Sequence, residues 1–218
     1  MSTEPGLRER KKQQTRQLIA DTARRLFAER GFDRVTVAEV AREADVAEKT
    51  VYNYFPTKED LFYSRLESFE EELLAAIRER PRGETILAAF RSYLLGQGGV
   101  LAMRSRGGDD EATRQVRTVT RVITESPALL ARERQVFARY TESLATLIAE
   151  ETGAAPDDVE PWAVANALLG LHRALIDYVR RRTLAGERAA VIAREVRRQA
   201  ERAFAVLERG LGDYAPKG

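Results

Sequence analysis

Residues 36–55, TVAEVAREADVAEKTVYNYF, predict two short helices joined by a tight turn. Thr36 and Glu39 stand three positions apart before an apolar run, which is the capping-box pattern of a helix start. The apolar spacing breaks at Asp45 and Val46, and a second helix follows at once. Two short helices around a turn of about three residues are typical of a helix-turn-helix.

The second of these helices, over residues 47–55, has two faces of different chemistry. Residues three and four positions apart share a helix face, so Ala47, Val51 and Phe55 form an apolar stripe. The opposite face carries polar and aromatic side chains, namely Glu48, Lys49, Tyr52 and Asn53. A helix anchored on one side and rich in hydrogen-bonding groups on the other suits the groove of a nucleic acid. The alternative is a surface helix that has two tyrosines by chance.

The composition excludes several classes of protein. The chain has 218 residues, 44% of them hydrophobic, and can bury a substantial core. The absence of cysteine excludes disulfides, thiolate zinc sites and cysteine nucleophiles. With one histidine, only carboxylates remain to build a metal site, and we expect no metal and no cofactor. The glycines near 96–99 follow no strand and lack the lysine of a phosphate loop, so an enzyme is the least supported class.

Hydropathy favours a cytoplasmic protein without a membrane partner. No apolar run approaches the roughly 18 residues of a membrane span, and no signal peptide follows Met1. The 36 Lys and Arg residues nearly balance the 34 Asp and Glu, but the basic residues gather near the N-terminus. The basic cluster consists of Arg8, Arg10, Lys11, Lys12 and Arg16, with only Glu9 against it. Such an arm suits nucleic acid, although a solvated chain terminus has the same composition.

The remaining segments predict an all-α fold, because apolar residues recur at helical spacing and no strand-like alternation competes. The first helix is expected to end at Gly31, where Phe32 can pack back on Phe27. A single helix is expected to begin at Thr57 and to carry Phe62, Leu66, Phe69, Leu73 and Ile77 on one face. Further helices are expected over residues 84–95, 112–123, 127–152, 161–179 and 187–210.

The segment from Thr15 to Phe62 closely resembles the DNA-binding domain of the TetR family of bacterial transcriptional regulators. The resemblance rests on LFAERGF at 26–32, the Thr36 capping box, TVYNYF at 50–55 and PTKEDLF at 56–62. These motifs cover about a quarter of the chain, and the rest is similar to the family only in length and helix pattern. The resemblance implies a three-helix helix-turn-helix domain with a basic arm over residues 1–56. A larger helical ligand-binding and dimerisation domain would follow over residues 57–218.

The resemblance also implies roles for individual residues on a double-stranded DNA operator. Residues 47–55 would be the recognition helix in the major groove. Base contacts are implied for Glu48, Lys49, Tyr52 and Asn53. Contacts to backbone phosphates are implied for Thr36, Thr50, Tyr54 and Lys58. Tyr54 has an alternative role, because its ring could pack partly against the first helix.

The sequence departs from the family pattern at two positions. Asp45 stands where the family usually has Gly in the turn, and Asp tolerates the left-handed conformation better than most residues. Ala47 replaces the Ser that commonly caps the recognition helix, which costs about 1 kcal/mol of stability. We expect the turn and the binding function to survive both changes.

The second domain is expected to form a dimer and to hold an effector. The helix over 161–179 is apolar around most of its circumference, so it and the helix over 187–210 could build a four-helix interface between two chains. Alternatively, both helices belong to the core of a monomer. Candidate residues of a mostly hydrophobic effector pocket are Phe69, Leu73, Phe90, Tyr93, Met103, Phe137, Tyr140, Trp162, Asn166 and His172. For His172, a hydrogen-bonded histidine of the core is the favoured interpretation.

These expectations describe a repressor that a hydrophobic small molecule releases from a palindromic operator. A ligand-independent architectural or interaction protein with the same helix-turn-helix is the alternative, and a central domain without a cavity would favour it.

Overall fold

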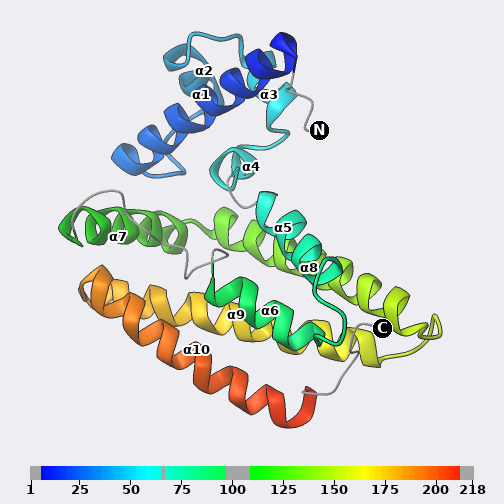
Figure 1. Ribbon diagram of the computed structural model, residues 1–218. Coiled ribbons are helices and arrows are strands. Elements are labelled where there is room, and N and C mark those ends of the chain that lie inside the picture. The colour runs from blue at the N-terminus through cyan, green and yellow to red at the C-terminus, as the bar shows by residue number, and fades with distance from the viewer. Residues whose placement is uncertain (1–5, 65–66, 97–108, 212–218) are drawn as a thin grey trace. The chain divides into compact units, whose positions relative to one another are not determined.

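The computed structural model describes residues 6–64, 67–96 and 109–211, and this part of the chain holds ten α-helices and no β-strand (Figure 1). The predicted all-α fold is therefore confirmed. The helices are α1 (Leu7–Arg30), α2 (Val37–Glu43), α3 (Glu48–Tyr54), α4 (Lys58–Phe62), α5 (Glu67–Arg78), α6 (Ile86–Leu95), α7 (Asp109–Glu125), α8 (Pro127–Thr152), α9 (Glu160–Leu184) and α10 (Ala189–Leu211). None of these helices combines the length and the apolar content that a membrane span requires.

The chain divides into two compact units. The first unit comprises Met1–Glu67 together with Val122–Leu130, and the second comprises Ser68–Arg121 together with Ala131–Gly218. Each unit has its own hydrophobic core. The predicted division into a DNA-binding domain over residues 1–56 and a ligand-sensing domain over residues 57–218 stays a prediction.

The core of the first unit closes around the end of α1. Gly31 ends the helix at a φ of +83°, a conformation that side chains with a Cβ rarely adopt, and its N–H donates to the Phe27 carbonyl at 2.9 Å. The Phe27 and Phe32 rings pack with their centroids 5.1 Å apart. The predicted helix end and the return of Phe32 onto Phe27 are both confirmed.

The prediction of one continuous helix from Thr57 is wrong. Thr57 does cap a helix, since its hydroxyl accepts from the Asp60 N–H at 3.1 Å, but α4 ends after Phe62. Phe62 packs 5.9 Å from the Phe27 ring in the core of the first unit, whereas Phe69 lies in the core of the second. The apolar residues of α4 and α5 keep one helical spacing although they belong to two different cores. The spacing alone therefore does not indicate that the helix ends after Phe62. Leu66 lies outside the described residues.

A second departure from the sequence interpretation is that residues 122–130 belong to the first unit. Val122, Ile123 and Leu129 are buried in its core, at the end of α7 and the start of α8. The Ser126 hydroxyl donates to the Asp33 carboxylate at 2.9 Å. The Tyr63 hydroxyl donates to the Leu129 carbonyl at 3.2 Å. The first unit is thus built from two pieces of sequence.

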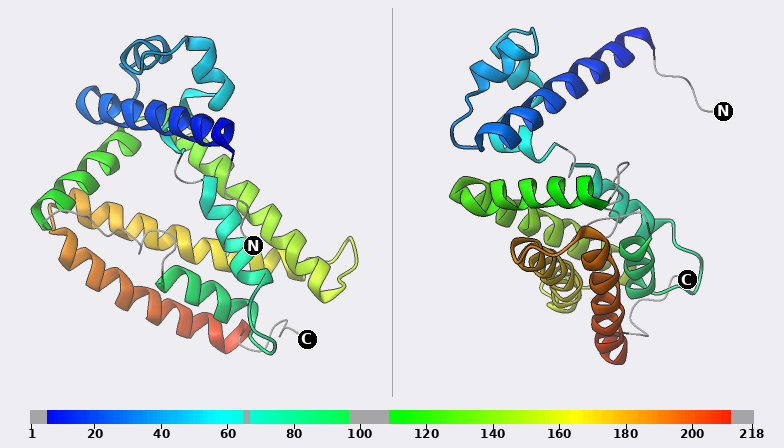
Figure 2. Two further views of the ribbon diagram at one scale, coloured as in Figure 1. Left: turned by 45° about the horizontal axis from the view of Figure 1, so that its top comes forward. Right: turned by 90° about the vertical axis from the view of Figure 1, so that its left-hand side faces the viewer.

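The second unit is a bundle in which α10 packs along α9 and against α6 (Figure 2). Its core combines aliphatic residues from α5, α6 and α8–α10 with several aromatic rings. Arg80, two residues beyond the end of α5, is almost fully buried and donates two hydrogen bonds of 2.6 and 3.1 Å to the Glu151 carboxylate. Separating α8 from the chain after α5 would leave the buried Arg80 charge without Glu151, which is strongly destabilising. The ion pair therefore holds these two segments together.

Candidate nucleic-acid interface and effector site

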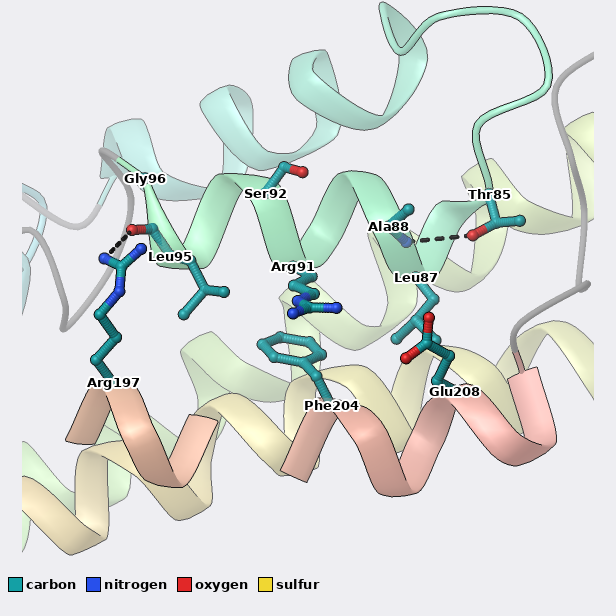
Figure 3. A pocket seen from close by; sticks show the side chains of 10 residues that line it. All are labelled: Thr85, Leu87, Ala88, Arg91, Ser92, Leu95, Gly96, Arg197, Phe204 and Glu208. Carbon is teal, nitrogen blue, oxygen red and sulfur yellow. Dashed lines mark hydrogen bonds between the residues drawn. The ribbon is translucent and has the colours of Figure 1, made fainter. Parts of the chain in front are cut away.

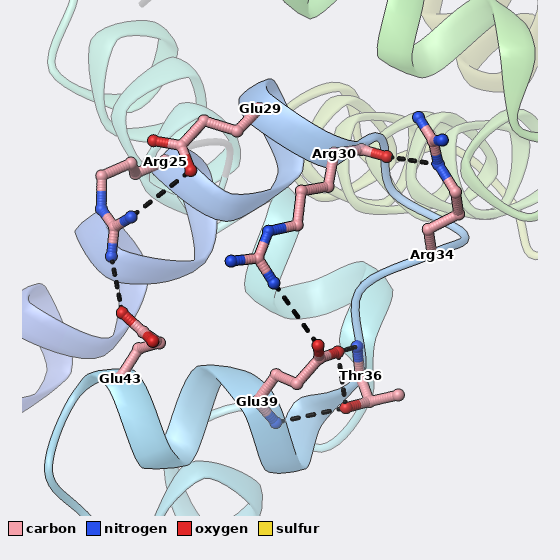
Figure 4. Close-up of polar contacts among 7 residues, drawn as sticks. All are labelled: Arg25, Glu29, Arg30, Arg34, Thr36, Glu39 and Glu43. Atoms are coloured by element: carbon pink, nitrogen blue, oxygen red, sulfur yellow. Dashed lines mark hydrogen bonds and ion pairs between the residues drawn. The ribbon is translucent and has the colours of Figure 1, made fainter.

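The start of α2 is fixed by the predicted capping box (Figure 4). The Thr36 hydroxyl accepts from the Glu39 N–H at 3.2 Å, and the Glu39 carboxylate accepts from the Thr36 N–H at 2.8 Å. The bond from the Thr36 backbone, followed by that from its hydroxyl, lowers the pKa of Glu39. Arg30 lies 3.5 Å from the same carboxylate. The Thr36 side chain is exposed, as a phosphate contact requires, but its hydroxyl already serves the cap.

The turn between α2 and α3 forms as expected. Asp45 has a φ of +52°, so the residue that replaces the usual Gly does adopt the left-handed conformation. The N–H of Val46 donates to the Ala41 carbonyl at 3.0 Å, and the Val46 side chain packs on the core of the first unit. This turn sets the direction in which α3 leaves α2.

Helix α3 separates an anchoring face from an exposed face. Val51 and Phe55 are each only 1% exposed and hold the helix on the core. Ala47, predicted to share their stripe, is exposed instead and caps α3 without a side-chain hydrogen bond. The four predicted base-contacting residues are all exposed: Glu48, Lys49, Tyr52 and Asn53. Within the described chain, neither Glu48 nor Lys49 has an ion-pair partner, so both charges remain available to an external ligand.

The predicted phosphate-contacting residues near α3 lie at its margins. Thr50 and Tyr54 are half-buried, and Tyr54 packs against the core of the first unit, so the phosphate contact and the packing on the first helix both stay predictions for it. Lys58 is also half-buried. Its Nζ lies 4.2 Å from the centre of the Phe32 ring and 5.9 Å from that of Phe27. Desolvation lowers the pKa of Lys58. A contact of its amine with a phosphate would compete with these ring contacts.

Five of the predicted pocket residues meet in an aromatic cluster of the second unit. Phe69 of α5 stacks on His172 of α9, with ring centroids 4.8 Å apart and planes 27° apart. Tyr93 of α6 and Tyr140 of α8 lie 5.6 and 5.5 Å from Phe69. Phe137 of α8 lies 5.6 Å from His172. The cluster thus draws on α5, α6, α8 and α9.

His172 is the unusual member of this cluster. It is 4% exposed, and neither of its ring nitrogens has a hydrogen-bond partner in the described structure. The interpretation of His172 as a hydrogen-bonded core histidine is therefore wrong. Desolvation lowers its pKa to about 4, so the ring is neutral at pH 7. A buried polar group without a partner is costly, and a ligand that supplied one would be favoured.

The remaining predicted pocket residues differ in position. Leu73 and Phe90 are buried in the same core as the cluster. Trp162 is 47% exposed, and the Asn166 amide, also exposed, donates to the Trp162 carbonyl at 2.8 Å. Met103 lies outside the described residues. The Tyr93 hydroxyl donates to the Glu72 carboxylate at 3.1 Å, and burial, followed by the Glu72 charge, raises the pKa of Tyr93.

A groove of about 500 Å³ lies elsewhere in the second unit, between α6 and α10 (Figure 3). Leu87, Leu95 and Phe204 supply apolar surface to it, and Arg91 lies between them. The Arg197 guanidinium donates to the Leu95 carbonyl at 3.0 Å across one end. Of the nine predicted pocket residues that the structure describes, none lines this groove. Over the described ranges, no group of three or more His, Asp or Glu side chains is arranged to hold a metal.

Comparisons with known proteins cover both units. Residues 19–64 match the family model of bacterial regulatory proteins of the tetR family, and residues 99–211 match that of the MftR C-terminal domain. The transcriptional regulator TcmR of Streptomyces glaucescens is 30% identical over 71% of this chain and 67% of its own. A putative mycofactocin biosynthesis regulator, MftR of Mycobacterium tuberculosis, is 27% identical over 74% and 78%. The crystal structure of NalD from Pseudomonas aeruginosa, a secondary repressor of the MexAB-OprM multidrug efflux pump, superposes with a TM-score of 0.54 at 20% identity. That superposition covers 91% of this chain and 95% of NalD.

Proposed function

Because the chain belongs to the TetR family of bacterial transcriptional regulators, we propose that it is a repressor released from a palindromic operator by a hydrophobic small molecule. The family consists of DNA-binding regulators and not of enzymes, in agreement with the sequence prediction. We assign DNA reading to residues 1–56 and effector sensing and dimerisation to residues 57–218. The protein would act in the cytoplasm, where the operator is.

The observation that carries the DNA-reading part of the proposal is the division of α3 into a buried and an exposed face. Lys49 would read a guanine edge or a phosphate, and Asn53 would pair with adenine. Tyr52 would pack on a thymine methyl group, while Glu48 would accept from cytosine. Contacts from Thr36, Thr50, Tyr54 and Lys58 to phosphates would fix the register without reading sequence.

Dimerisation is supported by the outer surface of α9. Its inner face is buried in the core, but Ala163, Gly170 and Ala174 on the outer face are exposed beside Trp162. A Cβ added at Gly170 would meet only open space. Small residues allow close approach of another helix, and an uncovered apolar face favours a partner over a role in the monomer core. Sedimentation at micromolar concentration should give a mass near twice 24.5 kDa. A monomer would contradict both the dimer and the palindromic operator.

The aromatic cluster is the proposed site of effector recognition. Its rings offer a largely apolar surface, and neutral His172 offers one N–H donor and one acceptor nitrogen. An effector that fits is hydrophobic and carries a hydroxyl, carbonyl or amide to pair with the imidazole. Effector binding and operator binding would weaken each other by the same factor, because the coupling between two sites is reciprocal.

Selection of duplexes from a randomised pool tests the DNA-reading part. The wild-type chain should enrich a palindrome, and Lys49→Ala should relax the preference at particular base pairs by about 1–3 kcal/mol. Lys58→Ala should weaken binding to all duplexes alike and reduce the salt slope by about one. An unchanged motif for Lys49→Ala would contradict the orientation of α3.

A release screen then separates the repressor from the architectural alternative. Hydrophobic compounds with a single polar group should displace the chain from the selected duplex. Displacement only by small, highly charged metabolites would contradict the effector class. Specific DNA binding that no compound displaces would favour the ligand-independent protein.

A further inference from the structure

Helix α1 changes character along its length. From Ile19 onward its inner face is apolar and buried, with Ala23 and Phe27 on the same side. The preceding part, residues 7–16, holds five cationic side chains against the single Glu9. The sequence left two roles open for this basic segment, an arm on nucleic acid or a solvated terminus. In the structure it continues α1 as a regular helix from Leu7.

The cations in the two parts of α1 differ in whether they form ion pairs. Beyond Ile19 the arginines are paired: Arg24 lies 2.7 Å from Asp21, Arg25 3.2 Å from Glu43 and Arg30 3.5 Å from Glu39. Before Ile19, four exposed side chains make no ion pair with any described residue: Arg8, Arg10, Lys11 and Lys12. Cations in the first turns of a helix also oppose its dipole. Among the side chains that the structure describes, no anion pairs with these four cations.

Three cations of the basic segment form a row on the side of α1 that contacts the end of α3. Arg8, Lys12 and Arg16 follow each other at intervals of four residues, in line with the buried Ile19 and Ala23. Arg16 fixes the direction of this row, because its guanidinium lies 4.9 Å from the centre of the Phe55 ring at the end of α3. Arg16 of α1 accordingly lies beside the C-terminal end of α3.

The row is long enough to meet several phosphates. A helix rises 1.5 Å per residue, so Lys12 and Arg8 lie about 6 and 12 Å beyond Arg16 along the axis. Double-stranded DNA carries one negative charge per roughly 1.7 Å of its axis. A duplex seated on α3 therefore presents a dense row of anions near Arg8 and Lys12, which make no ion pair with any described residue.

We propose that Arg8 and Lys12 bind the phosphate backbone of the DNA that flanks the base pairs read by α3. This inference rests on the proposed DNA-binding function and adds a second, sequence-independent contact surface to it. Arg16 is the positioning residue, since its stacking on Phe55 couples the direction of the basic row to the end of the recognition helix. The contacts add affinity and salt dependence without adding base preference.

The test compares two double variants of the full-length chain that remove equal charge from the same helix. R8Q/K12Q removes the two cations of the row that make no ion pair with a described residue, and R24Q/R25Q removes two paired cations. Gln has nearly the helix propensity of Arg and Lys, so both variants keep α1. Dissociation constants for the selected duplex are measured from 50 to 200 mM salt. R8Q/K12Q should lower the slope of log affinity against log salt by about 1.8 per subunit, and R24Q/R25Q should leave it unchanged.

The wild type should bind the duplex more tightly than R8Q/K12Q at 50 mM salt. This advantage in affinity should shrink roughly tenfold per subunit when the salt concentration rises to 200 mM. The base preference of R8Q/K12Q in a duplex selection should equal that of the wild type. Shortening the DNA that flanks the half-sites should bring the wild-type slope down to that of R8Q/K12Q, a measurement that needs no variant of altered fold.

Several outcomes would overturn the inference. One is a slope of log affinity against log salt that is the same for R8Q/K12Q and the wild type. A second is an equal change of this slope in R8Q/K12Q and R24Q/R25Q. Another is loss of binding to phosphatidylserine vesicles by R8Q/K12Q with an unchanged DNA slope, which would assign the row to a membrane surface. If the wild-type chain bound no duplex specifically, the proposed function would fail and this inference with it.

Discussion

The two units place their candidate functional side chains in opposite relation to their cores. In the first unit, α3 buries Val51 and Phe55 while Lys49, Tyr52 and Asn53 face solvent. In the second unit, the candidate effector residues Phe69, Tyr140 and His172 are themselves core residues. A helix that touches a ligand with its outer face can separate binding from stability. A bundle that encloses its ligand uses the same side chains for both.

This contrast indicates where a substitution can change binding without changing stability. Changes on the exposed face of α3 should alter DNA binding and leave the free energy of unfolding nearly unchanged. Changes in the aromatic cluster of the second unit should alter both together.

Replacement of the anchoring residue Phe55 should have the largest effect. Phe55→Ala removes a fully buried ring and leaves a cavity, so the free energy of unfolding should fall by about 3–5 kcal/mol. Operator binding should be lost with it, because α3 loses its anchor. Urea unfolding measures the first effect. The matched control is Tyr52→Ala on the exposed face of α3, which should change stability by less than about 0.5 kcal/mol. Similar losses for both variants would abolish the contrast between the faces.

Replacement of Asn53 should separate binding from stability. Asn53→Ala should reduce discrimination at one base pair by about 1–3 kcal/mol, because the amide no longer pairs with the base edge. Its free energy of unfolding should match that of the wild type to within about 0.5 kcal/mol, since Asn53 is exposed. Duplexes with single base-pair changes, titrated beside urea unfolding, provide both measurements. A large loss of stability would show that the exposed face also carries structure.

The pH dependence of stability should reveal the unpaired imidazole in the second unit. The folded pKa of His172 is about 4, below the 6.5 of an unperturbed histidine, so the unfolded chain takes up this proton first. The contribution of His172 therefore lowers the free energy of unfolding as the pH drops from about 6.5 to 4. The loss is about 1 kcal/mol per pH unit. His172→Leu should lack this contribution, and comparing the two proteins cancels the titration of the carboxylates. Parallel pH profiles would mean that the imidazole is paired in solution.

The smallest predicted effect is a gain in the first unit. Ala47 has the extended backbone of an N-cap, with φ −69° and ψ 145°, but no side chain that can accept from α3. Ala47→Ser should raise the free energy of unfolding by about 1 kcal/mol. The base preference in a duplex selection should stay the same, because the new hydroxyl bonds to the helix backbone. Ala47→Val, which adds volume without an acceptor, is the control and should give no gain.

The sequence predicted the first unit far better than the second, for a physical reason. Local rules fix the capping box at Thr36, the left-handed turn at Asp45 and the two faces of α3. The break after Phe62 escaped prediction, because apolar spacing does not tell which core each residue joins. Nor could periodicity show that His172 has no hydrogen-bond partner among the described residues, or that Trp162 is exposed, since both depend on packing between distant helices.

Because the core of the first unit includes residues 122–130, it cannot close while the ribosome is still making the segment before them. At about 5–20 residues per second, roughly 3–13 s separate the synthesis of residue 67 from that of residue 130. During this interval the nascent helix-turn-helix exposes the apolar surface that Val122, Ile123 and Leu129 later cover. A fragment that ends near residue 64 would keep that surface exposed permanently. Chaperones that hold apolar segments should therefore associate with the nascent chain until the start of α8 has emerged.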